Sequence, residues 1–278
     1  MISIKDISVI ITTFKSDNKI YPCLNSLPNN IKVFVIENSN NEKFKTKIEQ
    51  KYPNSKCILT GSNKGYSVAN NIGLLKVKTT YALVLNPDTI VDKNAFDKFL
   101  ISAKNNPDFW LIGPAENQIS MSSTKKNSIV EVENIKGFAM FFNLAKFNQD
   151  YFDENFFLYF EEIDLCKKVQ LKNGKIYLDS SIKINHEGDC SVDQNYKVEL
   201  EKNRNWHWMW STFYFHKKYK GFLIAFLIIF PKLISSFLRT IYYQLIFKNK
   251  KRDIYFFRLS GIINSIIGKK SWYRPTID

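Results

Sequence analysis

The residues best suited to chemistry are acids that stand at the ends of predicted elements. The apolar run YALVLN (residues 81–86) is typical of a strand covered on both faces, and it stops at Asn86-Pro87-Asp88. Pro87 cannot donate a hydrogen bond to a neighbouring strand, so we expect the strand to end there, with Asp88 just beyond its carboxyl end. Ligands of open α/β sheets bind at that edge. Asp88 is therefore the first candidate for a ligand-binding acid.

A second group of acids, Glu161, Glu162 and Asp164, opens a segment that we expect to be a helix closed by Gly174. Glu161 and Asp164 are three residues apart and would share one face of that helix. Acids in a first helical turn interact favourably with the helix dipole, so a structural role also explains the group as a set. It does not explain the aromatic run FFLYF (residues 156–160) directly before the acids.

His186 is one of three histidines in the chain. It lies in the segment KIYLDSSIKINHEG (residues 175–188), which we expect to form a strand pair leading to this histidine. A lone histidine is more often structural than functional, but its position directly after a predicted strand makes it a candidate ligand.

Four apolar runs alternate with three segments of helical character in the first part of the chain. Connections of a dozen or more residues permit parallel crossovers, so the pattern predicts an α/β fold with a mostly parallel, doubly wound sheet flanked by helices on both faces. The runs are residues 7–14, 32–37, 56–60 and 81–86, the helical segments lie near 18–27, 42–51 and 66–76, and further strands are expected at 110–114 and 136–143.

Such a sheet usually binds a nucleotide, yet the glycine motifs that cradle phosphates are missing. Neither GxGxxG nor GxxxxGK[ST] follows the first strand, where TTFKSDNK stands instead. This excludes the usual dinucleotide site and the P-loop. A divalent cation held by carboxylate and imidazole groups is the physical alternative for binding a diphosphate.

Composition indicates one large domain with an appendage. The chain has 278 residues, 45% of them apolar, which is enough for a sizeable core. The four cysteines lie far apart without CxxC spacing, which favours a reducing compartment over a zinc site or a disulfide framework. No basic segment followed by a long apolar core opens the chain, so we predict no signal peptide and a cytoplasmic protein.

The last part of the chain, residues 206–278, differs from the rest and is predicted to be a separate helical region after a first domain of residues 1–205. The net charge is +14, and this region holds 13 Lys and Arg against two acids. Its apolar stretch at 221–247 is flanked by HKKYK and KNKKR, a combination that suits an anionic membrane surface. The uninterrupted apolar run of about ten residues before Pro231 is shorter than the roughly 20 that a spanning helix needs, so we expect the region to lie in the membrane interface.

A buried helical pair in a second core is the alternative for this region. Nucleic-acid binding is excluded because Leu, Ile and Phe are too frequent between the basic residues.

Six short segments in order resemble a known enzyme family. They are SVIITTF, VIENSN, NKGYSVANNIG, LNPDT, FDENFFLYFEEIDLC and NHEGDCS. Together they are similar to the inverting family 2 glycosyltransferases of GT-A fold, in particular to the rhamnosyltransferase-like branch. The resemblance covers roughly residues 5–192, and each segment alone is short.

The resemblance implies a site for a nucleotide-sugar donor. A carboxylate or amide at a strand end can accept a hydrogen bond from a pyrimidine, and an aromatic ring can cover its face. The asparagines of NKGYSVANNIG could equally cap the start of a helix. The implied donor-binding residues are Thr12, Phe14, Glu37, Asn38, Asn63, Lys64, Asn70, Asn86 and Asp88, with Gly65 and Gly73 allowing close backbone approach.

The resemblance also implies a metal site and a catalytic base. Asn86-Pro87-Asp88 stands where the family has a DxD motif, so Asp88 would bind Mg²⁺ or Mn²⁺ against the diphosphate, with an amide in place of the first acid. His186 would complete the metal site. Glu162 would be the general base, where relatives have aspartate, while Glu161 and Asp164 would be structural or bind the acceptor.

These expectations describe a metal-dependent inverting glycosyltransferase of the hexosyl or rhamnosyl type. Its donor would be a UDP- or dTDP-sugar, and its acceptor a lipid-linked or polysaccharide glycan of bacterial surface-glycan synthesis. It would be peripherally associated with the inner face of the plasma membrane. The alternatives are a catalytically inactive GT-A binding scaffold and a sugar nucleotidyltransferase, which would release pyrophosphate.

Overall fold

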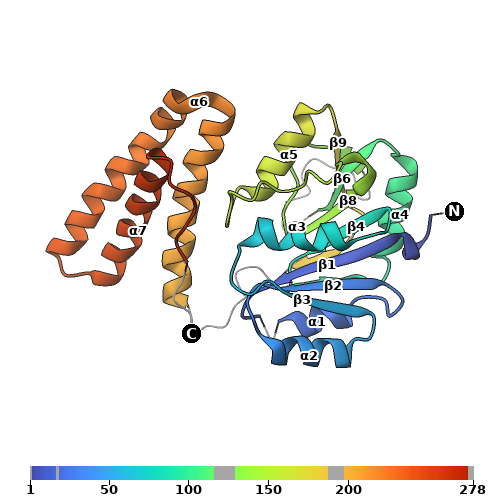
Figure 1. Ribbon diagram of the computed structural model, residues 1–278. Coiled ribbons are helices and arrows are strands. Elements are labelled where there is room, and N and C mark those ends of the chain that lie inside the picture. Colours follow the sequence, from blue (N-terminus) through green and yellow to red (C-terminus); the bar gives the residue numbers. More distant parts are fainter. Residues whose placement is uncertain (1, 17–18, 116–128, 187–196, 275–278) are drawn as a thin grey trace. The chain divides into compact units, whose positions relative to one another are not determined.

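The computed structural model describes residues 2–16, 19–115, 129–186 and 197–274 (Figure 1). Its central feature is an eight-stranded sheet in which the first four strands of the chain, β1 to β4, pair in parallel. β1 pairs in parallel with β2 and β4, and β2 with β3, whereas β8 runs antiparallel between β4 and β6. The strand order is β3 (Ser55–Leu59), β2 (Lys32–Glu37), β1 (Ile7–Thr13), β4 (Tyr81–Leu85), β8 (Ala139–Asn143), β6 (Phe109–Pro114), β9 (Lys175–Asp179) and β7 (Ile129–Glu131).

Helices cover both faces of this sheet, as expected for strands that are apolar throughout. β4 and β8 are buried along their whole length. One face packs against α1 (Ile20–Asn25), α2 (Glu42–Lys51) and α4 (Ala95–Asn105), and the other against α3 (Tyr66–Lys76) and α5 (Glu161–Leu171). Two short 3₁₀ turns, η1 (Ile4–Asp6) and η2 (Leu144–Lys146), complete the elements of this part.

A second, two-stranded sheet forms at the carboxyl end of β4. β5 (Thr89–Val91) follows Asp88 directly and pairs antiparallel with β10 (Ile184–His186). The pairing sets His186 opposite Thr89. A segment that comes almost a hundred residues later in the chain is thereby fixed beside the Asn86-Pro87-Asp88 turn.

The expected α/β fold with a mostly parallel central sheet is confirmed, and the differences from the sequence analysis are local. Within the expected strand pair at 175–188, the described residues 175–186 do not pair with each other, because β9 joins the large sheet beside β6 while β10 pairs with β5. The chain turns away after β9, where Asp179 Oδ1 accepts a hydrogen bond of 2.8 Å from Ser181 N and Lys98 Nζ binds Ser181 O. Three elements were not expected at all: α4, β5 and β7.

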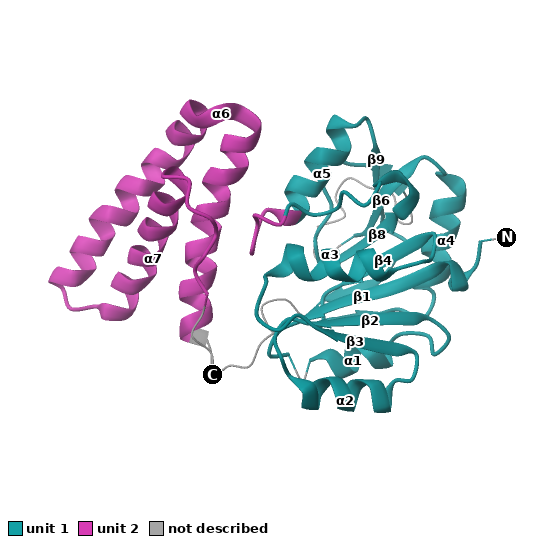
Figure 2. Cartoon of the chain, viewed as in Figure 1, with its two compact units in different colours: residues 1–153, 162–193 teal, residues 154–161, 194–278 magenta. Residues whose placement is uncertain are grey.

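The chain divides into two compact units (Figure 2). Unit 1 comprises Met1–Asp153 and Glu162–Asp193, and unit 2 comprises Glu154–Glu161 and Gln194–Asp278. Unit 2 therefore contains a short internal segment, residues 154–161, that interrupts unit 1 in the sequence. We call this segment the strap.

Two helices make up most of the described part of unit 2 outside the strap. α6 (Lys197–Leu245) has non-helical dihedrals at Gly221, with φ of 80°, which divides it into a first part at 197–220 and a second part at 222–245, followed by α7 (Asn249–Ile266). The three helical stretches share a small core of Met209, Phe213, Ala225, Ile229 and Ile262.

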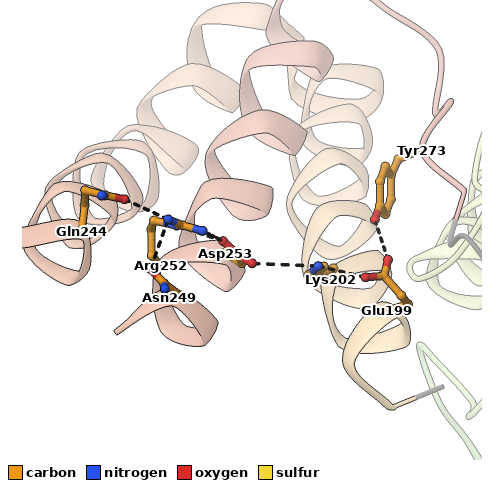
Figure 3. Close-up of polar contacts among 7 residues, drawn as sticks. All are labelled: Glu199, Lys202, Gln244, Asn249, Arg252, Asp253 and Tyr273. Carbon is orange, nitrogen blue, oxygen red and sulfur yellow. Dashed lines mark hydrogen bonds and ion pairs between the residues drawn. The ribbon is translucent and has the colours of Figure 1, made fainter. Parts of the chain in front are cut away.

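Polar contacts fasten these helices together (Figure 3). Asp253 of α7 lies 2.6 Å from Arg252 and 3.9 Å from Lys202 of α6, and Lys202 in turn lies 2.8 Å from Glu199. Tyr273, beyond the end of α7, donates from its hydroxyl to Glu199 Oε2 at 3.5 Å. The segment after α7 is thus tied back to the start of α6.

α6 is the one helix in the described residues that is long and apolar enough to cross a membrane. The sequence analysis ended the apolar run at Pro231, but the helix continues through this proline. An 18-residue window reaches a mean hydropathy of 2.1 and is only 17% buried. This length and composition fit both a spanning and an interfacial position.

Candidate active site

The carboxyl ends of β1, β2 and β4 lie together because these neighbouring strands run in parallel. Asn38 N donates to Thr13 O at 2.7 Å and joins the ends of β1 and β2. Thr12, Glu37, Asn38 and Asn86 all lie at or just past these ends. The sequence analysis expected this group at one edge of the sheet.

Glu37 ends β2 and is held by its own turn. Its carboxylate accepts from Ser39 Oγ at 2.7 Å and, through Oε2, from the backbone N–H groups of Ser39 at 3.1 Å and Asn41 at 3.3 Å. A pocket of about 300 Å³ lies over this turn, lined by Lys15, Glu37, Ser39, Asn40 and Asn41. Apart from Glu37, the sequence analysis missed the lining residues, although the polar run after the strand could have indicated them.

Asn38 organises the start of α3. Its Nδ2 donates to Asn63 Oδ1 and to Gly65 O, each at 3.1 Å, and its Oδ1 accepts from Lys64 N at 2.9 Å. Gly65 directly precedes α3 with φ of 87°, a conformation that favours glycine. Asn63 and Lys64 thus lie beside the end of β2, and Asn63 Oδ1 also accepts from Gly65 N.

Asn70 connects α3 to β1. Its Oδ1 accepts from Thr12 Oγ1 and its Nδ2 donates to Tyr66 O, both at 3.0 Å. These contacts give Asn70 and Thr12 a structural role at the edge where ligands bind. Phe14 follows β1 and is half-buried, and its carbonyl accepts from Ser16 Oγ at 3.1 Å.

Asp88 and His186 come together although 97 residues separate them in the sequence. The pairing of β5 with β10 brings His186 Nε2 to 3.4 Å from Asp88 Oδ1. The Asp88 side chain is 1% exposed, and the His186 side chain is 21% exposed. The rest of the NHEGDCS segment, from Glu187 onward, lies outside the described residues.

The dipeptide Gly137–Phe138 joins the candidate residues and was missed by the sequence analysis. Phe138 stacks on the His186 ring with centroids 4.8 Å apart and planes at 7°, and its carbonyl accepts from Asn86 N at 2.9 Å. The Gly137 carbonyl accepts from Tyr66 Oη at 2.8 Å.

Glu162 lies beside Gly137. A Cβ placed on Gly137 would lie 3.5 Å from Glu162 Cβ and 3.7 Å from its Cδ, so the glutamate side chain borders the space that a side chain at position 137 would enter. Glu162 and His186 therefore lie beside consecutive residues of one short segment. The sequence signal was weak, because KGFAMFFN indicated a strand but not which strand it would join.

The three acids of α5 differ in their surroundings. Asp164 is completely buried and Glu161 is 6% exposed, whereas Glu162 is half-buried. Burial raises the pKa of Glu162, while the positive charge of Lys136 acts in the opposite direction. Of the three, Glu162 has the most accessible side chain together with a pKa shifted toward neutrality.

The residues around Asp88 fit a divalent cation with few protein ligands. Among the described residues, no three His, Cys, Asp or Glu side chains gather at one place. A carboxylate beside an imidazole nitrogen leaves most of the coordination sphere to phosphate oxygens and water, which is the usual arrangement of Mg²⁺ at a phosphate-bearing substrate. The imidazole nitrogen also suits Mn²⁺.

The fold and the site together define an α/β protein whose polar residues gather at the carboxyl ends of parallel strands, next to a partly buried acid helix. Solved structures share the fold. TarS of S. aureus, over residues 1–349, matches 96% of this chain and 93% of its own at 15% identity with a TM-score of 0.54, and a longer TarS structure matches 72% and 39% at 16% identity with a TM-score of 0.52. GalNAc-T7, solved with UDP, GalNAc and Mn²⁺, matches 72% of this chain and 50% of its own at 13% identity, with a TM-score of 0.56.

The family follows from the sequence. Residues 8–165, more than half of the chain, match the pattern of Glycosyl transferase family 2, so the chain belongs to this family. A curated relative, the low-salt glycan biosynthesis hexosyltransferase Agl10 of Haloferax volcanii, is 24% identical over 195 residues. That alignment covers 60% of this chain and 62% of the relative, so the chain spans about three fifths of the relative's length.

Proposed function

We propose that this protein is a glycosyltransferase that moves a sugar, with inversion, from a UDP- or dTDP-sugar to a lipid-linked or polysaccharide acceptor in bacterial surface-glycan synthesis. In this proposal residues 1–205 carry out the transfer and residues 206–278 associate with the membrane. The observation that carries the proposal is the Gly137–Phe138 dipeptide: Phe138 stacks on the candidate metal ligand His186, and a Cβ on Gly137 would lie 3.5 Å from Cβ of the candidate base Glu162.

The donor binds at the carboxyl ends of β1 and β2. The nucleoside lies over the turn that holds Glu37, where a pocket of about 300 Å³ is available. Asn38 and Asn63 hold the start of α3 beside it, and Lys64 N is fixed by Asn38. The carboxylate of Glu37 has lone pairs beyond those used by its turn and accepts from the base.

Asp88 and His186 hold Mg²⁺ or Mn²⁺ at the diphosphate. The cation would neutralise charge that develops on the leaving diphosphate. Support comes from the 3.4 Å approach of the two side chains and from Mn²⁺ in the GalNAc-T7 structure. Phe138 stacks on the imidazole of His186 and fixes the plane of the ring. Asn86 stands in place of the first acid of the DxD motif, and its backbone N–H donates to Phe138 O.

Glu162 accepts the proton of the acceptor hydroxyl as that oxygen attacks the anomeric carbon. A raised pKa makes the carboxylate a stronger base, provided that the pH is high enough to ionise it. Asp164 is completely buried and serves the structure of α5. Glu161 is nearly buried and is assigned to structure or to acceptor binding.

One experiment tests the transferase proposal and its alternatives. The full chain is incubated with Mn²⁺ and single nucleotide-sugars, and the released product is identified. Release of UDP or dTDP from one sugar nucleotide supports the proposal, while release of pyrophosphate from a sugar phosphate and a nucleoside triphosphate indicates a nucleotidyltransferase. Binding of a nucleotide-sugar without any turnover, even with glycan acceptors present, indicates an inactive scaffold.

Association with an anionic membrane is proposed for unit 2. Among the residues that the structure describes, most of the exposed large apolar side chains lie on this unit, including Leu223 at 77%, Leu227 at 71% and Phe247 at 83% exposed. Lys and Arg flank them at both ends of the apolar stretch, which suits acidic lipid head groups.

Vesicle binding measures this association. Leu223→Glu and Leu227→Glu should each weaken binding to vesicles containing phosphatidylserine, because an exposed apolar contact is replaced by a charge of the wrong sign. High salt should weaken binding of the parent by screening the flanking charges. Equal affinity of parent and variants for neutral and anionic vesicles would contradict the proposal.

A further inference from the structure

The strap is the only part of unit 2 that lies between two stretches of unit 1 in the sequence, and it leads directly into the acid helix. α5 begins at Glu161, the last residue of the strap, and the next residue is Glu162 (Figure 2). Whatever fixes the strap therefore fixes the first turn of α5. The contacts of the strap inside unit 2 show what holds it.

Phe157 is held from two sides. Its ring stacks on the imidazole of His207, with centroids 4.4 Å apart and planes at 25°, and the guanidinium carbon of Arg274 lies 3.7 Å from the ring centroid. Phe157 is 4% exposed and His207 is completely buried. Stacking and cation–π contacts of this kind are strong when they are shielded from water.

His207 is itself locked in place. One ring nitrogen, Nε2, lies 2.9 Å from Tyr273 O, and the other, Nδ1, lies 2.9 Å from Ser271 Oγ. Burial lowers the pKa of His207 to about 3, so the imidazole stays neutral near pH 7. Tyr273 is also tied to Glu199 on α6, as Figure 3 shows. The segment after α7 thus closes a clamp over Phe157.

Other residues of the strap contact α6. Ser211 Oγ donates to Leu158 O at 3.0 Å, and Phe156 packs edge-on against Tyr214 with centroids 4.9 Å apart. Tyr159 packs edge-on against Trp208 at 5.2 Å. Every one of these partners belongs to unit 2.

The backbone is strained between the clamp and the acids. Tyr159 and Phe160 both adopt left-handed conformations, with φ of 69° and 70°. Non-glycine residues rarely adopt this conformation, and such strain persists only where surrounding contacts enforce it. A strap released from its clamp would relax, and the first turn of α5 would move with it.

We propose that unit 2 is part of the transfer machinery: the clamp of Phe157 between His207 and Arg274 holds the strap and thereby positions Glu162 for the acceptor. Phe157, His207 and Arg274 are positioning residues and touch neither donor nor acceptor. The inference rests on the proposed role of Glu162 as the base. It gives residues 206–278 a function in catalysis beyond membrane association.

The test compares Phe157→Ala with a conservative and a matched variant. Phe157→Tyr keeps the ring between His207 and Arg274, and Phe213→Ala removes a fully buried phenylalanine from the core of unit 2 instead of from the clamp. Each full-length variant is assayed for sugar transfer, for hydrolysis of the donor without acceptor, and for hydrogen exchange.

Phe157→Ala should lower kcat for transfer by about 10²-fold, the effect of moving a reacting group by an ångström, with an unchanged KM for the donor. Donor hydrolysis should stay at the parent rate, because water needs no correctly placed Glu162. Amide exchange should accelerate in residues 158–164. Phe157→Tyr should restore transfer, and Phe213→Ala should retain it while lowering the thermal midpoint.

The pH profile separates positioning from simple destabilisation. Burial raises the pKa of Glu162, Lys136 lowers it, and the neighbouring groups on α5 are Glu161, Asp164 and the Cys166 thiol. If α5 shifts and water reaches Glu162, the acid limb of the transfer profile should move to lower pH in Phe157→Ala. His207 does not titrate in this range and cannot cause the shift.

Several outcomes would overturn the inference. One is that Phe157→Ala transfers at the parent rate. Another is that Phe157→Ala and Phe213→Ala reduce transfer and donor hydrolysis alike, which would make the clamp merely structural. If Phe157→Ala does not fold, Arg274→Gln removes only the cation from the clamp, and it must then slow transfer but not hydrolysis. A parent protein without donor turnover would instead refute the proposed function.

Discussion

Glu162→Gln is the sharpest test of the proposed mechanism, because it removes the basicity of the side chain and keeps its shape. The glutamate side chain lies beside Gly137, 3.5 to 3.7 Å from the point that a Cβ of this residue would occupy, and glutamine fills the same space. The replacement therefore leaves the packing of α5 and of the segment before β8 in place. Any loss of transfer then reports on the carboxylate itself.

The expected loss follows from the role of a general base. Such a group contributes typically 10²- to 10⁴-fold, or about 3 to 5 kcal/mol of transition-state stabilisation. The group acts on the acceptor, so affinity for the donor and its hydrolysis in water should change little. Because the pKa of Glu162 is raised, the parent should lose activity below a pH somewhat above the ordinary range for glutamate, and this acid limb should vanish in the glutamine variant.

The assay measures transfer rates against acceptor concentration at saturating donor, between pH 5 and 9, with nucleoside diphosphate affinity measured separately. Glu161→Gln and Asp164→Asn are the matched controls, and they should act on stability or acceptor affinity instead of on the pH profile. The reasoning fails if Glu162→Gln transfers sugar at the parent rate while a folded Asp164→Asn does not. In that case the completely buried Asp164 would have to become accessible during the reaction and act as the base.

Three further predictions concern the metal site, stability and packing. Asp88→Asn and His186→Ala should each weaken Mn²⁺-dependent binding of the nucleoside diphosphate, measured by calorimetry, while the affinity for the free nucleoside stays unchanged. The loss should be at least the roughly 10- to 100-fold that is typical when a residue holding a metal ligand is changed. An equal loss of affinity for the diphosphate and for the nucleoside would indicate a role in the fold. Glu162→Gln should raise the thermal midpoint at pH 7, because burial disfavours the ionised glutamate of the parent. This gain in the midpoint should disappear toward about pH 4, where the glutamate is protonated in the folded and in the unfolded chain. A gain that stays constant with pH would contradict the raised pKa of Glu162. Gly73→Ala should lower the free energy of unfolding by about 1–3 kcal/mol, since its Cβ would lie 2.5 Å from Ile10 Cγ2, whereas Gly137→Ala should be nearly neutral in the same urea titration.

The parallel half of the sheet was predictable from sequence because its signals are local. Each of its strands is an apolar run that ends at a polar turn, and parallel neighbours bring those ends to one edge. Asn86-Pro87-Asp88 illustrates this, since Pro87 ends the strand wherever the strand lies in the sheet. The donor-binding candidates from Thr12 to Asn70 were found in the same way or through the family resemblance.

Pairings between distant segments were not predictable. β10 pairs with β5 instead of β9, and nothing within residues 175–188 specifies that partner. The strap likewise carries an aromatic run whose partners, His207 and Arg274, lie some 50 and 117 residues further along the chain. The sequence showed only that this aromatic run precedes the acids, whereas the structure shows Phe157 packed against His207 and Arg274 within unit 2.

The antiparallel direction of β8 explains how the candidate metal ligand His186 and the candidate base Glu162 come to lie beside the same short segment. A parallel strand beside β4 would have begun at the edge opposite the ligand, but an antiparallel strand begins where β4 ends, with Ala139 opposite Leu85. The residues immediately before β8 are therefore forced to the ligand-binding edge, and these are Gly137 and Phe138. A side chain at Gly137 would come into contact with Glu162, and a smaller residue at Phe138 would leave the His186 ring without its stacking partner. The reversal of strand direction at β8 is thus what places one dipeptide beside both the candidate base and the candidate metal ligand.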